Sequence, residues 1–394
     1  TIINDDIQPL LTLTKIVVND NGGTLGVADF PLDVSGTSVD SGVQTGFNAG
    51  NYTANEVEDA GYAASAWTGD CAANGDVSLA VGEVKECFIT NDDIEPLLTV
   101  TKMVINDNGG TLGVADFPLF VDATSVDSGV QNGFAAGDYT VSETEDDGYE
   151  ASVWGGDCAE DGSITLAAGD VKACTITNDD IQPLLTLVKM VVNDTGGTLG
   201  VADFPLDVSG TSVDSGVQNG FDAGEYMANE VEDDGYAASV WGGDCADDGS
   251  ITLEVGDVAE CTITNDDIQP LLTLTKMVVN DNGGTLGVAD FPLDVSGTSV
   301  DSGVQNGFDA GDYTANEVED DGYEAGLWTG DCADDGSITL EVGDVAQCTI
   351  INDDIQPLLT LTKIVVNDNG GTLGVADFPL DVSGTSVDSG VQTG

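Results

Sequence analysis

Hydrophobic and polar residues alternate in the first clearly patterned stretch of this sequence, residues 11–17. Leu11, Leu13 and Val17 share one parity with Lys15, and threonines stand at positions 12 and 14. A period of two is typical of a strand that turns one face toward a core. Similar short stretches recur about every ten residues up to residue 91, separated by turns rich in Gly, Asn and Asp. The pattern predicts an all-β fold, an antiparallel β-sandwich of about seven strands with immunoglobulin-like or related topology.

The first stretch returns through the chain at a fixed period. Its lysine recurs at Lys102, Lys189, Lys276 and Lys363, always 87 residues on. A constant period of this length indicates tandem copies of one small domain. We expect residues 1–10 to be the tail of a preceding repeat, residues 11–97, 98–184, 185–271 and 272–358 to be four complete repeats, and residues 359–394 to be part of a fifth. Because residues 349–394 are identical to residues 1–46, we interpret the sequence as a segment of a longer array.

The charge of the chain excludes several classes of function. It carries 72 acidic residues against 7 basic ones, all lysines, with no histidine, and its net charge is −65. Such a surface repels nucleic acid and anionic membranes and needs cations to screen it. No apolar run approaches the roughly 18 residues of a membrane span. Without histidine a nucleophile lacks its usual base, so we expect no enzyme.

Cysteines occur twice in each repeat, always sixteen residues apart. They form the pairs Cys71 and Cys87, Cys158 and Cys174, Cys245 and Cys261, and Cys332 and Cys348. Zinc sites usually use more closely spaced ligands and often histidine. We therefore predict one disulfide per repeat, and an extracellular location, secreted or on the cell surface, because disulfides persist in oxidising compartments.

Three polar residues of each repeat fall on strand faces that should point inward. Lys15 shares its face with Leu11 and Leu13, Glu56 with Tyr52 and Ala54, and Asn91 with Cys87 and Ile89. A buried ammonium group needs a partner. The lysines at positions 85 and 172 become alanine at positions 259 and 346 of later repeats, whereas the strand lysine is kept. We infer that this lysine is structurally required.

At these residues the chain resembles a known family. Lys15, residues 22–30, residues 52–56 and residues 89–91 are similar to the SpaA/Cna-B-type prealbumin-like domain of bacterial pilins and adhesin stalks, and the resemblance covers every repeat. In that family the matching lysine and asparagine can form an isopeptide bond promoted by the matching glutamate. The resemblance thus implies crosslink triplets at Lys15, Glu56 and Asn91; Lys102, Glu143 and Asn178; Lys189, Glu230 and Asn265; and Lys276, Glu317 and Asn352. The alternative is a buried Lys–Glu ion pair with the asparagine hydrogen-bonded nearby.

Acidic clusters near the strand ends offer oxygen ligands of the kind that calcium prefers. Asn19, Asp20, Asp92 and Asp93 are the candidates in the first repeat. They match no EF-hand loop, and a solvated acidic face explains them equally well. We predict no other cofactor.

Two functions fit these observations. The first is a structural stalk or filament that provides length and mechanical stability at the cell surface, with other copies of the same chain or array as partners. The second is a repetitive adhesin whose domains bind a carbohydrate or protein ligand, for which Trp67 and its copies could supply stacking platforms. Near-identical repeats suit a spacer and also a multivalent binder.

Overall fold

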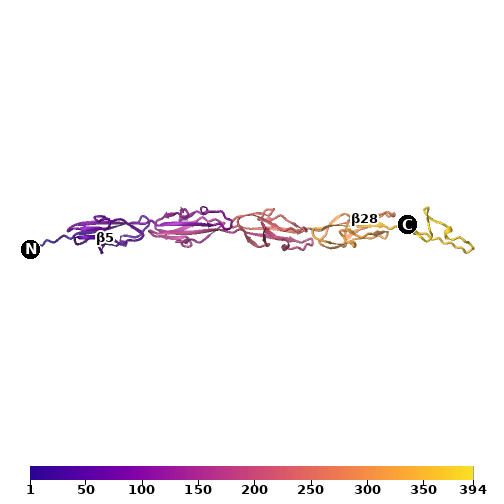
Figure 1. Ribbon diagram of the computed structural model, residues 1–394, viewed down its shortest axis with the longest axis horizontal. Coiled ribbons are helices and arrows are strands. Elements are labelled where there is room, and N and C mark those ends of the chain that lie inside the picture. The colour runs from indigo at the N-terminus through magenta and orange to yellow at the C-terminus, as the bar shows by residue number, and fades with distance from the viewer. Residues whose placement is uncertain (394) are drawn as a thin grey trace. The chain divides into compact units, whose positions relative to one another are not determined.

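The computed structural model describes residues 1–393, which are almost entirely strands and turns (Figure 1). The first repeat contains β1 (Leu10–Val18), η1 (Val27–Asp29), β2 (Leu32–Val34), β3 (Thr37–Val39), β4 (Gln44–Gly46), β5 (Gly50–Glu56), β6 (Tyr62–Ala64), β7 (Thr68–Gly69), β8 (Asp76–Leu79) and β9 (Val84–Asp93). Here η denotes a single turn of 3-10 helix. The predicted all-β sandwich is confirmed. It also contains strands of only two or three residues, which are too short to show an alternating pattern in the sequence.

The later repeats contain the same elements in the same order. The second has β10 (Leu97–Ile105), η2 (Val114–Asp116), β11 (Leu119–Val121), β12 (Thr124–Val126), β13 (Gln131–Gly133), β14 (Gly137–Glu143), β15 (Tyr149–Ala151), β16 (Gly155–Gly156), β17 (Ser163–Leu166) and β18 (Val171–Asp180). The third has β19 (Leu184–Val192), η3 (Val201–Asp203), β20 (Leu206–Val208), β21 (Thr211–Val213), β22 (Gln218–Gly220), β23 (Gly224–Glu230), β24 (Tyr236–Ala238), β25 (Gly242–Gly243), β26 (Ser250–Leu253) and β27 (Val258–Asp267). The fourth has β28 (Leu271–Val279), η4 (Val288–Asp290), β29 (Leu293–Val295), β30 (Thr298–Val300), β31 (Gln305–Gly307), β32 (Gly311–Glu317), β33 (Tyr323–Ala325), β34 (Thr329–Gly330), β35 (Ser337–Leu340) and β36 (Val345–Asp354). The remaining residues contain β37 (Leu359–Thr360), η5 (Val375–Asp377), β38 (Leu380–Val382), β39 (Thr385–Val387) and β40 (Gln392–Thr393).

Each complete repeat is built from two sheets. In the first repeat a five-stranded sheet has the order β4-β1-β9-β6, with β7 also paired to β9, and a four-stranded sheet has the order β3-β2-β5-β8. The first and last strands of the repeat, β1 and β9, are parallel neighbours from Leu10↔Val84 to Val18↔Asp92. The other pairs of the first repeat are antiparallel. The chain therefore enters and leaves a repeat along two strands that lie side by side.

The core of each repeat lies between its two sheets. Leu11 and Leu13 of β1 meet Leu32 and Val34 of β2, and all four are at most 3% exposed. Alternate residues of both strands point inward, as the period of two predicts. Burying side chains of this size supplies roughly 1.5–3 kcal/mol each relative to leaving them exposed. A separate core of this kind lets each repeat act as one small domain.

The described chain divides into two compact units. The first consists of Thr1–Leu185 with two short segments, Gly220–Glu225 and Thr252–Ala259, and so contains the first two repeats. The second holds the rest of the described chain. None of the helical turns within residues 1–393 is long and apolar enough to cross a membrane.

Candidate functional site

A buried lysine and a buried glutamate face each other across the two sheets of the first repeat. Lys15 projects from β1 of the five-stranded sheet, and Glu56 ends β5 of the four-stranded sheet, opposite Leu32. The side chain of Lys15 is 0% exposed and that of Glu56 is 4% exposed. The Nζ of Lys15 donates a hydrogen bond to Oε2 of Glu56 and lies 4.5 Å from the centre of the Phe30 ring. Both predicted inward faces are confirmed, and the pair bridges the sheets.

Asn91 supplies the third polar group of this site. It lies on β9 and is 0% exposed. In the parallel register Lys15 is opposite Ile89 and Val17 is opposite Asn91. Lys15 and Val17 share a face, so the lysine and the asparagine occupy the same inner face of neighbouring strands. They are diagonal neighbours, because Asn91 is two residues beyond the position opposite Lys15.

The asparagine amide has no ordinary hydrogen-bonding role. Among the described residues, neither Oδ1 nor Nδ2 of Asn91 has a hydrogen-bond partner, and neither does Oε1 of Glu56. Leaving a buried polar atom unpaired costs about 1–3 kcal/mol, so such atoms are rare and need an explanation. The unpaired atoms belong to the glutamate that pairs with the lysine amine and to the asparagine on the neighbouring strand.

The later repeats reproduce the site. Their buried ion pairs are Lys102–Glu143, Lys189–Glu230 and Lys276–Glu317, and their asparagines Asn178, Asn265 and Asn352 are each 1% exposed. Oδ1 of each asparagine and Oε1 of each glutamate again lack a partner in the described chain.

Burial shifts the protonation of the lysine. Loss of hydration lowers the pKa of the Lys15 ammonium below its ordinary value, and the hydrogen bond and charge of Glu56 oppose this shift only in part. The pKa values of Lys102, Lys189 and Lys276 are lowered for the same reason. A lowered pKa makes the neutral, nucleophilic amine more accessible. The site therefore combines an amine, a carboxyl group and a primary amide in a place closed to water.

The four predicted disulfides are present. They join Cys71 to Cys87, Cys158 to Cys174, Cys245 to Cys261 and Cys332 to Cys348, with Cα–Cα distances of 5.3–5.4 Å. Cys87 lies on β9 opposite Leu13 and is 0% exposed. Each disulfide thus anchors the loop after β7, or after its counterpart β16, β25 or β34, to the last strand of its repeat.

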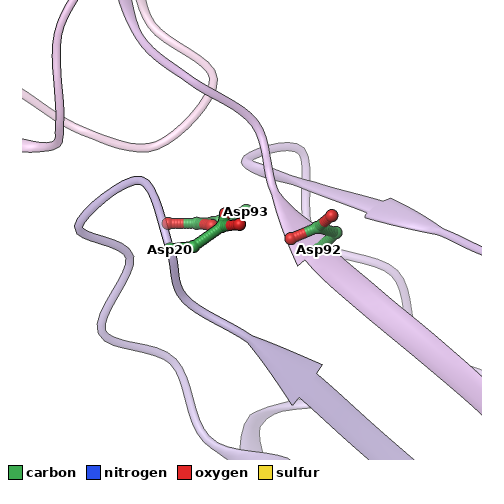
Figure 2. Close-up of side chains that lie close together, drawn as sticks. All are labelled: Asp20, Asp92 and Asp93. Carbon is green, nitrogen blue, oxygen red and sulfur yellow. The ribbon is translucent and has the colours of Figure 1, made fainter.

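Three of the four predicted calcium ligands come together at the end of β9. Figure 2 shows Asp20 beside Asp92 and Asp93, and one carboxylate oxygen of each lies within 4.8 Å of the others. The same group forms in the other repeats from Asp107, Asp179 and Asp180; Asp194, Asp266 and Asp267; and Asp281, Asp353 and Asp354. These carboxylates could hold a metal ion.

The buried member of this cluster is already stabilised by the backbone. Asp93 is 3% exposed, and its carboxylate accepts hydrogen bonds from the N–H groups of Asn21 at 2.9 Å and Gly23 at 2.6 Å. Burial raises the pKa of Asp93, but these N–H donors outweigh it and hold the pKa below the ordinary value. Asp93 therefore shapes the loop at residues 19–23 without needing an ion.

Asn19, the fourth predicted ligand, is engaged in hydrogen bonds of its own. Its Oδ1 accepts a hydrogen bond from the Tyr62 hydroxyl at 2.6 Å, and its Nδ2 donates to the Leu25 carbonyl at 3.0 Å. Tyr62 in turn accepts the N–H of Leu25. The sequence offered no signal for this network, because Tyr62 is 43 positions from Asn19.

The tryptophans do not form exposed platforms. Trp67, Trp241 and Trp328 are 6–8% exposed and are part of the core, and Trp154 is partly buried against it. A sugar could not stack on a ring in this position.

Comparison with known proteins identifies the type of domain. The family model described as a prealbumin-like fold domain matches residues 6–89, 93–176, 180–263 and 267–350. No curated protein matches the chain.

Three solved structures show more distant similarity. The Bacillus anthracis TIE protein is 13% identical, with 90% of this chain and 75% of that chain covered and a TM-score of 0.45. The open conformation of the pilus adhesin SpaC from Lactobacillus rhamnosus GG is 14% identical, with 70% and 45% covered and a TM-score of 0.23. Two B repeat units of the collagen binding protein of Staphylococcus aureus are 14% identical, with 89% and 100% covered and a TM-score of 0.17. Because these scores are low, the assignment rests on the family model.

Proposed function

Because this chain belongs to the family of prealbumin-like fold domains, we propose that it is a structural segment of an extracellular stalk or filament whose repeats bear tension. The parallel pairing of first and last strands is the observation that carries this proposal. It is present between β1 and β9, between β10 and β18, and between β28 and β36. Disulfides in every complete repeat support a location outside the cell.

The strand geometry determines how a pulling force acts on a repeat. Force applied through the chain enters at the start of β1 and leaves at the end of β9. Because the two strands are parallel neighbours, these points lie at opposite ends of one ladder of hydrogen bonds. The ladder is loaded in shear, so all its bonds must fail together rather than one after another. This arrangement suits a domain that must stay folded under tension.

We further propose that Lys15 and Asn91 are joined by an isopeptide bond, as are Lys102 and Asn178, Lys189 and Asn265, and Lys276 and Asn352. The support is their placement on one inner face of neighbouring strands, the lowered lysine pKa and the unpaired amide of the asparagine. In the reaction the Nζ lone pair of the neutral lysine attacks Cγ of the asparagine, and the Nζ–Cγ bond forms as the Cγ–Nδ2 bond breaks. The proton lost by the amine passes through the Glu56 carboxyl group to Nδ2, which leaves as ammonia. Atoms balance without any other reactant.

The bond would change the route of the force. Lys15 is in β1 and Asn91 is in β9, so tension would pass directly between the two strands and bypass residues 16–90. In a stalk, such a covalent connection would keep each repeat from unfolding under tension. Other copies of the same chain or array are the partners that this function requires.

Intact-mass spectrometry tests the crosslink. We expect the mass of the oxidised chain to fall short of the sequence mass by one ammonia for each complete repeat, beyond the hydrogens lost to the disulfides. Glu56→Ala should restore one ammonia, whereas Glu58→Ala, at an exposed neighbouring position, should restore none. A chain of unmodified mass would leave the site as the buried ion pair considered from the sequence.

A ligand-binding role as an adhesin is the alternative. No surface feature described above favours it, and the buried tryptophans remove the platform that the sequence suggested. Calcium binding at the three-aspartate clusters remains a prediction, with the exposed Asp20 and Asp92 as the available ligands.

A further inference from the structure

Two neighbouring repeats touch through backbone groups in the first compact unit. The connection between them is the strap, defined here as residues 93–96. Its Ile94 donates its N–H to the carbonyl of Gly61 in the first repeat at 2.9 Å, and its carbonyl accepts the N–H of Gly169 in the second repeat at 2.7 Å. One residue of the strap is thus hydrogen-bonded to both repeats.

A second contact lies beside the strap. The N–H of Ala136, in the turn before β14, donates to the carbonyl of Asn21 at 2.6 Å. Asn21 belongs to the loop that Asp93 holds in place, so the acceptor is presented by a fixed part of the first repeat. The loop and the strap together offer the second repeat two acceptors at separate points.

Glycines make this close approach possible. A Cβ on Gly61 would lie 2.6 Å from the Ala168 carbonyl oxygen, and a Cβ on Gly22 would lie 2.6 Å from the Ala136 carbonyl oxygen. Real side chains do not tolerate such distances to backbone atoms, so any other residue at these positions would push the two repeats apart.

The second compact unit shows the same contacts independently. Ile268 donates to Gly235 at 2.9 Å and accepts from Gly343 at 2.7 Å, and Ala310 donates to Thr195 at 2.7 Å. Thr195 stands where the first repeat has Asn21, and the contact is kept because it uses the backbone carbonyl. The interface therefore depends on backbone position and on glycine rather than on one side chain.

We propose that the second repeat docks on the first, and the fourth on the third, through this interface, so that each of these repeats is a binding partner for its neighbour in the same compact unit. The strap is then fixed by hydrogen bonds to both repeats and does not act as a flexible hinge. This inference does not depend on the isopeptide bond, because none of its contacts involves the crosslink triplets. If the repeats do not dock, the loss of ammonia expected from the crosslink in intact-mass spectrometry would be unchanged.

The chain provides its own matched control. Gly322 is the fourth-repeat counterpart of Gly61, and within the described residues only Asp320 Oδ1 of its own repeat lies within 4 Å of a Cβ there, at 3.1 Å. Neither glycine has a positive φ. Gly61→Ala and Gly322→Ala thus make the same local change with and without a docked neighbour. Gly196→Ala and Gly283→Ala form a second pair. Both glycines have φ of 94°, but in the described part of the chain a Cβ would meet atoms within 4 Å only at Gly196, those of Ala310.

Hydrogen–deuterium exchange at single-amide resolution on the full chain tests the proposal. In the parent we expect the amides of Ala136 and Ala310 to exchange at least about tenfold more slowly than that of Ala49, which has no preceding repeat in the described chain. Gly61→Ala should abolish this protection at Ala136 and Gly169, and Gly196→Ala should abolish it at Ala310. Gly322→Ala and Gly283→Ala should leave these amides unchanged. Equal exchange at Ala49, Ala136 and Ala310, or equal profiles within each pair of variants, would overturn the proposal.

Discussion

Asn91→Ala offers the most direct test of the proposed tension-bearing function. The change removes the amide acceptor from the first repeat and leaves its disulfide and the other three repeats intact. If the crosslink forms, the parent chain should reach its full length under force without any unfolding step from the four complete repeats. The variant should show one step, from the repeat that has lost its covalent connection.

The size of that step follows from the structure. A repeat spans 87 residues, and the disulfide spanning 16 residues removes that part from the extension. About 70 residues remain, which extend to roughly 240 Å at 3.4 Å per residue. The folded repeat already spans about 40 Å, judged from a nine-residue strand and its flanking turns. We therefore expect a step of about 200 Å.

Atomic force spectroscopy on the full chain measures this step. Reducing agent should lengthen it by about 50 Å, since the 16 residues closed by the disulfide are then released. Asn48→Ala is the control, because Asn48 is exposed and, among the described residues, only its backbone carbonyl forms a hydrogen bond, accepted from the Tyr52 hydroxyl. Four steps of about 200 Å in the parent, or none in Asn91→Ala, would refute the reasoning.

Three further predictions concern stability. Cys71→Ser combined with Cys87→Ser should lower the free energy of unfolding of the first repeat by about 3 kcal/mol, as the chain-entropy model gives for a loop of this size; guanidinium titration followed at that repeat would measure it, and an unchanged midpoint would contradict it. Asp93 has a lowered pKa in the folded state, so its contribution to the free energy of unfolding is present above the unfolded pKa of about 3.9 and is lost as pH falls through the lower folded value. Asp93→Asn should therefore weaken the acid dependence of thermal unfolding at pH 2–5. An identical pH profile in the parent and the variant would exclude the stabilising role of the Asp93 carboxylate at the loop of residues 19–23. Millimolar calcium should raise the thermal midpoint relative to sodium chloride of equal ionic strength if the three-aspartate clusters bind it, whereas equal midpoints would leave charge screening as the whole effect.

The sequence predicted the inward faces well, because strand parity depends only on local geometry. Lys15, Glu56 and Asn91 were placed in the core from their spacing to Leu13, Ala54 and Ile89, and their burial confirms it. The cysteine spacing was equally informative, since each repeat contains two cysteines and each therefore has one possible partner within its own repeat.

Pairing between distant strands was beyond the reach of the sequence pattern. Alternation cannot reveal that β1 and β9 are parallel neighbours, and this register is what brings Lys15 near Asn91. The role of Asn19 was also missed, because its partner Tyr62 is fixed by the tertiary fold. Physical reasoning from the sequence thus predicts which side chains of a strand point inward, whereas the structure shows which residues of other strands they lie beside.

The Cys71–Cys87 bond has a consequence for damage by proteases. It encloses β8, which is an edge strand of the four-stranded sheet, and the turn that follows it. Exposed turns at sheet edges are preferred sites of cleavage. A cut between the two cysteines would leave both fragments covalently attached to the same repeat, so a nicked molecule would keep its continuity. A surface protein exposed to hydrolases could therefore accumulate several such cuts, one in each repeat, before any part of it was shed.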